Sequence, residues 1–263
     1  MPAAAALRAE IESALAQRVP KPLEYKPLAA AERVSTGIPE VDRLVGGGIP
    51  RGCLTEICGA TSSGRTTLLI SLLAQVTQKG EAAALIDVSD AFAPDQAAEA
   101  GVALESLLWV RCGGSKDAEP GKKWGSEARI EQALKITDWL LQAGGFSVIA
   151  LDMAGVSPWL ARRIPLTSWF RFRRAVENTA TAFVLLEEKS YAGTCASLGI
   201  RTERARANWS VMQPSQAQPE QNLTTLLSEI TFTAEVVRSR LLGTEERRPV
   251  ARVFNAQPGW KIG

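Results

Sequence analysis

The stretch that decides the fold runs Gly59-Ala60-Thr61-Ser62-Ser63-Gly64-Arg65-Thr66-Thr67. It follows an apolar run that reads as a buried strand, and it opens a helical pattern. In a loop of this spacing the glycines allow a tight wrap, backbone N–H groups point at phosphate oxygens, and the helix N-terminus adds its positive end. We therefore expect a Walker A loop whose nine residues bind nucleotide, with the Thr66 hydroxyl on Mg²⁺.

A second apolar strand ends in a carboxylate. The run Ser147-Val-Ile-Ala-Leu-Asp152 has the form of a Walker B strand, whose acid holds the magnesium shell. Two elements in this order are far more specific than either alone. Thr66 and Asp152 are thus the expected metal ligands, and ATP with Mg²⁺ is the expected cofactor.

The loop departs from its consensus at one residue. Arg65 stands where a lysine is usual, which keeps the charge but replaces a compact ammonium with a broad planar fork. The lysine follows the phosphates into the transition state at close quarters. We expect that binding survives this change and that hydrolysis is weak or absent.

Composition limits the remaining possibilities. The chain has 263 residues, of which 46% are hydrophobic, enough for one main domain with a short appendage. No apolar run is long enough to span a membrane and no secretory signal is evident, which predicts a cytoplasmic protein without a membrane partner. Histidine is absent, so histidine-based triads and general bases are excluded. The four cysteines are scattered, which predicts buried, reduced thiols.

The chain divides into residues 1–33 and 34–263. Ala3 to Arg18 has the apolar spacing of an amphipathic helix, and Pro20 to Pro27 reads as a stiff linker. Two partners for the apolar stripe stay open: the helix folds back on its own domain, or it docks on a neighbouring protomer or another protein.

From Val34 onward, strands and helices alternate, which predicts an α/β fold with a mainly parallel sheet flanked by helices. The expected strands are Leu54 to Cys58, Ala82 to Val88, Leu107 to Val110, Ser147 to Asp152, Phe183 to Leu186, Leu198 to Arg204, Glu229 to Arg238 and Val250 to Phe254. The expected helices are Thr66 to Gln78, Pro94 to Gly101 and Glu127 to Gln142. Gly113 to Gly125 and Gln213 to Gln221 read as loops, and the last two strands as a C-terminal β-hairpin.

These residues resemble the core of the RecA recombinases from about Val34 to Phe254. The matching motifs are Ser35-Thr36-Gly37-Ile38, Asp42, Gly46 to Gly52, Glu56 to Gly59, Ser62 to Thr67, Leu85-Ile86-Asp87 and Val236 to Arg240. The resemblance implies that Arg238 and Arg240 reach across a subunit interface to a neighbour's ATP. It also implies possible self-association.

The departures from the recombinases matter as much. The glutamate that orients the attacking water is matched by Ser89, with Asp90 one residue out of register. The first DNA-binding loop shrinks to Met153 to Ser157, and the second to roughly Lys189 to Ala196. Glu187-Glu188 replaces an Asn-Gln pair before that second loop, where two carboxylates facing a phosphate backbone would repel it.

A shortened RecA core with altered catalytic and DNA loops resembles the ImuA family, and the run Tyr191-Ala192-Gly193 fits that family. ImuA proteins are accessory factors of damage-induced translesion synthesis. The resemblance implies a role in the SOS response to DNA damage, with a RecA filament and a lesion-bypass polymerase as partners.

Two other functions stay open. One is a working recombinase and DNA-dependent ATPase, in which Arg65 replaces the lysine and Asp90 the glutamate. The other is a single-stranded DNA-binding module built on a cluster that interleaves aromatic residues with arginines. The cluster comprises Trp159, Arg162, Arg163, Trp169, Phe170, Arg171, Phe172, Arg173 and Arg174. The competing interpretation places Trp169, Phe172 and Val176 in the core, with Arg171 and Arg174 in solvent.

Overall fold

A computed structural model describes residues 32–112, 125–211, 225–240 and 252–256. These residues belong to one unit that begins at Glu32. The predicted helix Ala3 to Arg18, its linker, and nearly all of the two predicted loops lie outside the described residues.

The main sheet has eight strands in the order β10-β9-β8-β3-β7-β6-β4-β5. Their bounds are β3 (Leu54–Cys58), β4 (Ala83–Asp87), β5 (Leu107–Arg111), β6 (Val148–Asp152), β7 (Ala182–Glu187), β8 (Leu198–Val211), β9 (Thr225–Ser239) and β10 (Arg252–Ala256). Strands β8, β3, β7, β6, β4 and β5 are parallel, whereas β9 and β10 pair antiparallel at one edge. The predicted α/β fold with a mainly parallel sheet and antiparallel C-terminal strands is confirmed.

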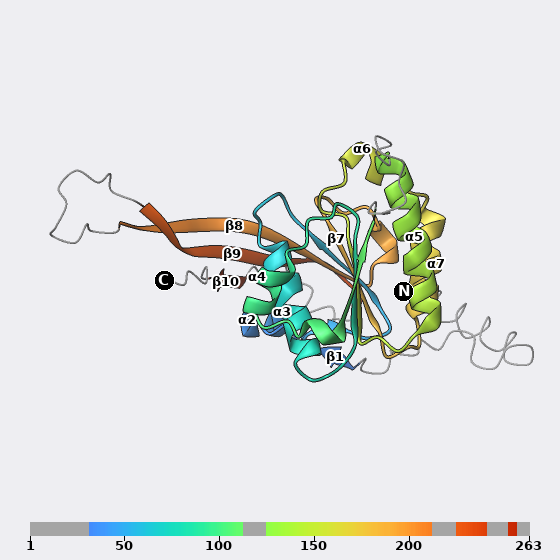
Figure 1. Ribbon diagram of the computed structural model, residues 1–263, viewed down its shortest axis with the longest axis horizontal. Coiled ribbons are helices and arrows are strands. Elements are labelled where there is room, and N and C mark those ends of the chain that lie inside the picture. The colour runs from blue at the N-terminus through green and yellow to red at the C-terminus, as the bar shows by residue number, and fades with distance from the viewer. Residues whose placement is uncertain (1–31, 113–124, 212–224, 241–251, 257–263) are drawn as a thin grey trace, which may run out of the picture. The chain divides into compact units, whose positions relative to one another are not determined.

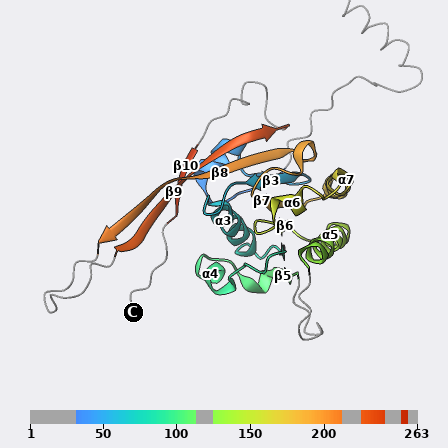
Figure 2. The same ribbon diagram turned by 90° about the horizontal axis from the view of Figure 1, so that it is seen from above.

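Helices cover both faces of this sheet (Figures 1 and 2). They are α2 (Pro39–Val45), α3 (Arg65–Thr77), α4 (Pro94–Glu99), α5 (Ser126–Ala143), α6 (Pro158–Ala161) and α7 (Leu166–Val176). Short 3₁₀ turns span Leu104–Ser106 and Gly193–Cys195. None of the described helices is long and apolar enough to cross a membrane.

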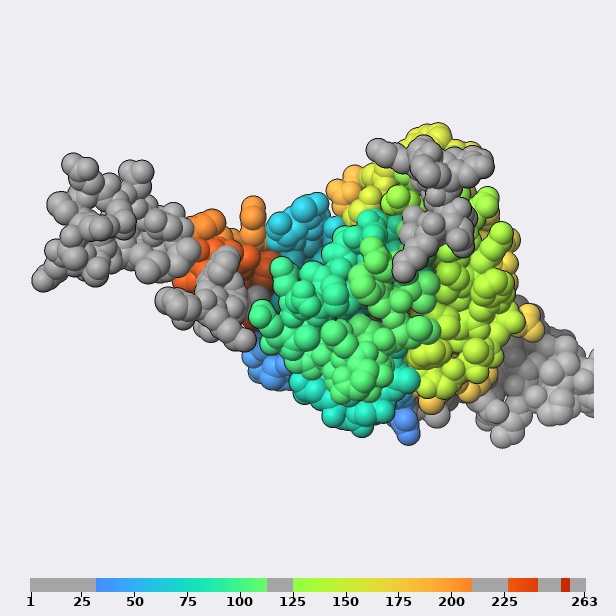
Figure 3. Space-filling model, in the orientation of Figure 1, coloured from blue at the N-terminus to red at the C-terminus, as the bar shows by residue number. Residues whose placement is uncertain are grey.

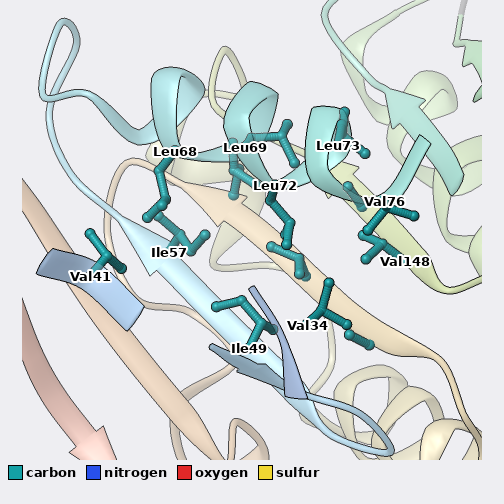
Figure 4. Close-up of a cluster of buried hydrophobic side chains, with 14 of the residues drawn as sticks. Val34, Val41, Ile49, Ile57, Leu68, Leu69, Leu72, Leu73, Val76 and Val148 are labelled. Carbon is teal, nitrogen blue, oxygen red and sulfur yellow. The ribbon is translucent and has the colours of Figure 1, made fainter. Parts of the chain in front are cut away.

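One core lies between the sheet and α3. Leu68, Leu69 and Leu72 come from α3 and meet Ile57 of β3 and Val148 of β6 (Figure 4). All five side chains are buried, because α3 presents a continuous apolar face to the buried strands of the sheet. This packing fixes the start of α3, and with it the phosphate loop, against the sheet.

The second core lies on the opposite face, under α5 and α7. Trp169, Phe172 and Val176 are fully buried there, and the ring of Phe172 lies 5.8 Å from that of Phe183 in β7. Arg171 and Arg174 are exposed. The interpretation of Trp169, Phe172 and Val176 as core residues is therefore confirmed. The four cysteines are buried as well, as expected.

The turn before α2 explains the Ser-Thr-Gly motif. The Asp42 carboxylate accepts hydrogen bonds from the Thr36 N–H (2.8 Å), the Thr36 hydroxyl (2.7 Å) and the Ser35 hydroxyl (2.6 Å). Gly37 then crosses α3 with φ of 77°, where a Cβ would lie 2.7 Å from the Ser71 hydroxyl. The motif thus fastens the turn before α2 onto α3.

The strands β8 and β9 extend further than predicted, to Val211 and from Thr225. Figure 1 shows these two strands standing out from the body as an arm, and in Figure 3 their orange and red atoms project from it. Register shifts between Arg204 and Arg206 and between Asn208 and Trp209 interrupt the alternation on which the shorter bounds were based. Helix α2 and the two-residue strands β1 (Arg33–Val34) and β2 (Ile49–Pro50) were not predicted, because such short elements carry little periodicity.

The two tryptophans of the arginine-rich cluster differ sharply in burial, since Trp169 is 0% exposed and Trp159 is 65% exposed. We predict that Trp169→Ala lowers the free energy of unfolding by about 3–5 kcal/mol, and Trp159→Ala by less than about 1 kcal/mol. Urea denaturation followed by circular dichroism measures both. Equal losses would contradict the assignment of Trp169 to the core.

Candidate nucleotide-binding site

The loop from Gly59 to Thr67 joins β3 to α3 in the conformation that a phosphate loop needs. Ser62 and Gly64 have left-handed φ values of 61° and 90°. A Cβ on Gly64 would lie 2.7 Å from the Phe232 ring of β9, and one on Gly59 would lie 2.4 Å from the Thr202 carbonyl oxygen of β8. Both glycines are required because the neighbouring strands press directly on the loop.

The side chains of the loop reinforce this contact with β8. The Ser63 and Thr202 hydroxyls lie 3.0 Å apart in a buried hydrogen bond, and the Ser63 N–H donates to the Ala60 carbonyl at 3.1 Å. The loop is thus anchored to β8 through Ser63, while Ala60, Thr61, Ser62 and Thr66 are open to solvent.

A cleft of about 900 Å³ lies beside the exposed residues of the loop. Its walls come from the loop, the outer face of α3, the segment from Ser89 to Ala100, and three apolar residues of β9, which are Leu227, Ile230 and Phe232. Thr66 and Asp152 both line it. The structure therefore brings the two predicted metal ligands to the same cleft.

Asp152 ends β6 beside Asp87, its register partner at the end of β4. Its carboxylate accepts the Ala154 N–H at 2.8 Å. Burial raises the pKa of Asp152; the Ala154 hydrogen bond lowers it, the negative charge of Asp87 raises it and Arg65 lowers it. Asp87 is committed to structure, since it accepts the N–H groups of Ala91 (3.1 Å) and Phe92 (2.9 Å).

Arg65 does not present a free cation to the cleft, contrary to the expectation that it takes the lysine's place among the phosphates. Its side chain bonds to main-chain carbonyls of three segments: Gly59, Glu187 (3.2 Å) and Ala154 (3.3 Å). The residue is only 7% exposed. A guanidinium offers five N–H donors in a fixed fork, and here the fork joins the ends of β3 and β7 to the turn after β6.

Ser89 and Asp90, which match the position of the recombinases' catalytic glutamate, are not placed to accept a proton from water in the cleft. Ser89 lines the cleft and packs on Gly155, where a Cβ would lie 2.4 Å from the Ser89 hydroxyl. Asp90 has a left-handed φ of 56° and pairs with Arg111 through two contacts of 2.7 Å. The hydrogen bond from Arg111 lowers the pKa of Asp90. Asp90 does not line the cleft, so the structure brings no carboxylate there from this segment.

The expectation that Glu187 and Glu188 both face a phosphate backbone is wrong for Glu187. Glu187 is 1% exposed and its carboxylate accepts the Tyr191 N–H at 3.0 Å. Glu188 is half-buried and lines a pocket of about 600 Å³ between the Gly59 to Ser63 part of the loop and β8. Side chains alternate between the two faces along β7, so Glu187 lies on the same face as Leu185, which is the face that α7 covers.

Sequence reasoning missed the partner of Glu187, which is the buried Glu56 on β3. The Glu56 carboxylate accepts the Ser190 hydroxyl (2.6 Å) and the N–H groups of Tyr191 (2.8 Å) and Ala192 (3.0 Å). Burial raises the pKa of Glu187 to about 10, and Glu56 acts in the same direction. Glu187 is therefore protonated at neutral pH. The sequence signal that could have revealed this pair is the presence of one glutamate within each of two mainly apolar strands, β3 and β7.

Arg238 and Arg240 bond within their own chain. Arg238 donates to the Gly193 carbonyl and Arg240 to the Thr194 carbonyl. Together with Glu56 they fasten the segment from Ser190 to Thr194 on both sides. Their reach to a neighbouring protomer remains a prediction.

The carbonyl contacts of Arg65 generate a first prediction for this site. We expect Arg65→Ala to lower the free energy of unfolding by at least about 2 kcal/mol, because it leaves buried carbonyl groups without donors. The exposed Arg206→Ala is the control and should change stability by less than about 0.5 kcal/mol. Chemical denaturation measures both variants, and a neutral Arg65→Ala would refute the anchoring role.

The Glu187 proton generates a second prediction. The folded state keeps a proton that the unfolded chain releases above its ordinary pKa of 4.5. The contribution of Glu187 to stability is thus fully present below that pH and is lost as the pH rises toward 10. Glu187→Gln removes this loss, so its advantage over the wild type should grow with pH, by on the order of 1 kcal/mol per unit. Denaturation at pH 6 and about pH 9 tests it; a constant difference would contradict it.

Comparison with known proteins shows the family to which the sequence belongs. The model of the RecA N-terminal domain matches residues 5–159. The RecA proteins of Rickettsia canadensis (strain McKiel) and Rickettsia bellii (strain RML369-C) are 35% and 36% identical over 151 residues, which is 57% of this chain and 40% of theirs. RecA of Caulobacter vibrioides is 34% identical over 152 residues, 57% of this chain and 38% of its own length. The chain thus spans about two fifths of the relatives it matches. Because the family model covers more than half of it, the chain belongs to the RecA N-terminal domain family.

Proposed function

We propose that the protein is an accessory member of the RecA superfamily that acts in the DNA damage response without efficient ATP hydrolysis. Its closest functional model is the ImuA type, which links a RecA filament to a lesion-bypass polymerase in translesion synthesis. In this role it works in the cytoplasm as an adaptor, and its RecA-like surfaces serve for association.

The observation that carries the proposal is the state of Arg65. In a working phosphate loop the cation at this position must be free to follow charge as it develops on the phosphoryl group. Here the guanidinium already bonds to three carbonyl oxygens of the protein. Ser89 cannot accept a proton from water in place of a carboxylate, and Asp90 is paired with Arg111. Both features support binding without turnover.

The remaining loop residues fit a nucleotide. Left-handed Ser62 and Gly64 shape the loop, and the Thr66 hydroxyl and the Asp152 carboxylate line the same cleft. We propose that the Gly59 to Thr67 backbone holds the phosphates of ATP and that Thr66 and Asp152 hold Mg²⁺. The bound metal would neutralise phosphate charge, and the chain's own part is to hold the nucleotide in place.

The working-recombinase alternative needs Asp90 as the base. The two 2.7 Å contacts from Arg111 and the position of Asp90 outside the cleft weigh against it. The alternative of a single-stranded DNA-binding module loses two of its aromatic residues, because Trp169 and Phe172 cannot stack on bases from the core.

Association with RecA tests the proposal. A pull-down of purified RecA on immobilised protein, with and without ATP, should recover a complex. Charge reversal at Arg238 and Arg240, the residues proposed to complete a neighbour's ATP site, should reduce recovery at least about tenfold. Arg204→Glu with Arg206→Glu, at exposed positions of the neighbouring strand β8, is the matched control.

Because Arg238 and Arg240 also hold the Gly193–Cys195 turn, thermal unfolding of the variant must accompany the assay. Recovery of RecA equal to that of a blank resin, by a folded wild-type protein, would sink the proposal.

A further inference from the structure

The segment from Pro158 to Val176 carries an unbalanced charge. It holds five arginines and no acidic residue. Three of the arginines form ion pairs: Arg163 with Glu127 (2.6 Å) and Arg171 with Asp138 (3.0 Å), both on α5, and Arg173 with Glu177 (2.9 Å) at the end of α7 itself. Arg162 and Arg174 are exposed and form no ion pair within the described part of the chain. Positive charge is thus left over on this surface.

Large apolar side chains lie between these cations. Leu166 is 57% exposed and Phe170 is 49% exposed, and the two stand one helical turn apart on α7. Their neighbours Trp169 and Phe172 are fully buried. The apolar residues of α7 therefore divide into an inner set, which builds the core, and an outer pair, which the fold does not use.

A pocket of about 340 Å³ continues this surface beyond Leu166. Its apolar lining comes from Ile164, Leu166 and Tyr191, and its rim carries Arg162 and Lys189. Lys189 is exposed and, among the described residues, has no ion-pair partner. A lining that combines apolar side chains with two cations suits a ligand that is both apolar and acidic.

We propose that α6 and α7 dock an acidic amphipathic helix of a partner protein. One apolar side chain of that helix enters the pocket beside Leu166, a second covers Phe170, and its carboxylates face Arg162, Lys189 and Arg174. The inference adds a partner surface to the proposed function and does not rest on the nucleotide cleft, since α7 packs on the sheet face opposite to α3 (Figure 1).

The exposed residues favour a protein helix over single-stranded DNA. Stacking of successive bases requires several free aromatic faces, whereas Trp169 and Phe172 are in the core, which leaves Phe170 as the one exposed ring of α7. The Arg163 guanidinium lies 4.6 Å from the Trp159 ring centre and covers one of its faces. Leu166 has no ring with which to stack. An aliphatic and an aromatic residue at i and i+4 form the spacing that a second helix covers.

Fluorescence anisotropy of the whole protein tests the proposal with a defined probe. The probe is a labelled peptide of about 18 residues with leucines at helical i, i+3, i+4, i+7 spacing and glutamates elsewhere. Binding in the range of about 10 µM is expected at low salt, weakening as salt rises. A peptide with lysine in place of glutamate, and a labelled oligo-dT of about 20 nucleotides, should bind the α7 surface at least about tenfold more weakly.

Two variants locate the binding. The pair Arg162→Glu and Arg174→Glu, and separately the pair Leu166→Ser and Phe170→Ser, should each weaken peptide binding at least about tenfold. Arg204→Glu with Arg206→Glu on β8, and Leu108→Ser on β5, are matched controls at exposed sites and should leave it unchanged.

Two results would overturn the proposal. One is absence of peptide binding to the folded wild type. The other is oligo-dT binding that the α7 variants abolish, which would assign the surface to nucleic acid. Neither outcome bears on RecA association, so failure here is distinct from failure of the proposed function.

Discussion

The guanidinium of Arg65 is the group on which the arrangement of this site depends. A buried cation must have its N–H donors satisfied, because an unpaired charge in the interior is far more unfavourable than a lost neutral hydrogen bond. Arg65 meets this need with the carbonyl oxygens of Gly59, Ala154 and Glu187. Those carbonyls belong to the phosphate loop, the turn after β6 and the end of β7. One side chain thus holds together three segments that would otherwise be connected only through the sheet.

The acids at the carboxyl edge of the sheet fit this arrangement. Glu56, Asp87, Asp152 and Glu187 end or nearly end four neighbouring strands, so ionising all of them would place like charges close together. The chain reduces the repulsion by keeping Glu187 protonated and by giving Asp87 and Glu56 backbone N–H donors. Of the four, Asp152 is the one that lines the cleft. The chemistry available there is therefore binding of a cation or a phosphate, with no base from the Ser89 segment beside it.

The local features of the molecule could be predicted from the sequence. The phosphate loop, the strand ending at Asp152 and the buried face of Trp169, Phe172 and Val176 each follow from spacing within one element. The partners of Arg65 could not be predicted in this way, since two of them lie 89 and 122 residues away. The same holds for Glu56 with Glu187, for Asp90 with Arg111, and for the bonds of Arg238 and Arg240 to the Gly193–Cys195 turn. Side chains that find partners across the fold leave no periodic signal, and the wrong orientation expected for Glu187 has this cause.

Phosphate release from ATP is the measurement that tests the central claim most directly, namely that this RecA-family site binds without turnover. The purified protein is titrated with a fluorescent ATP analogue and Mg²⁺, and phosphate release is then followed with and without single-stranded DNA. The account predicts saturable binding and a release rate that DNA does not raise above that of a protein-free blank. DNA-stimulated hydrolysis by the wild-type protein would contradict it, because it would mean that Arg65 leaves its carbonyl partners and serves the phosphates as the lysine does.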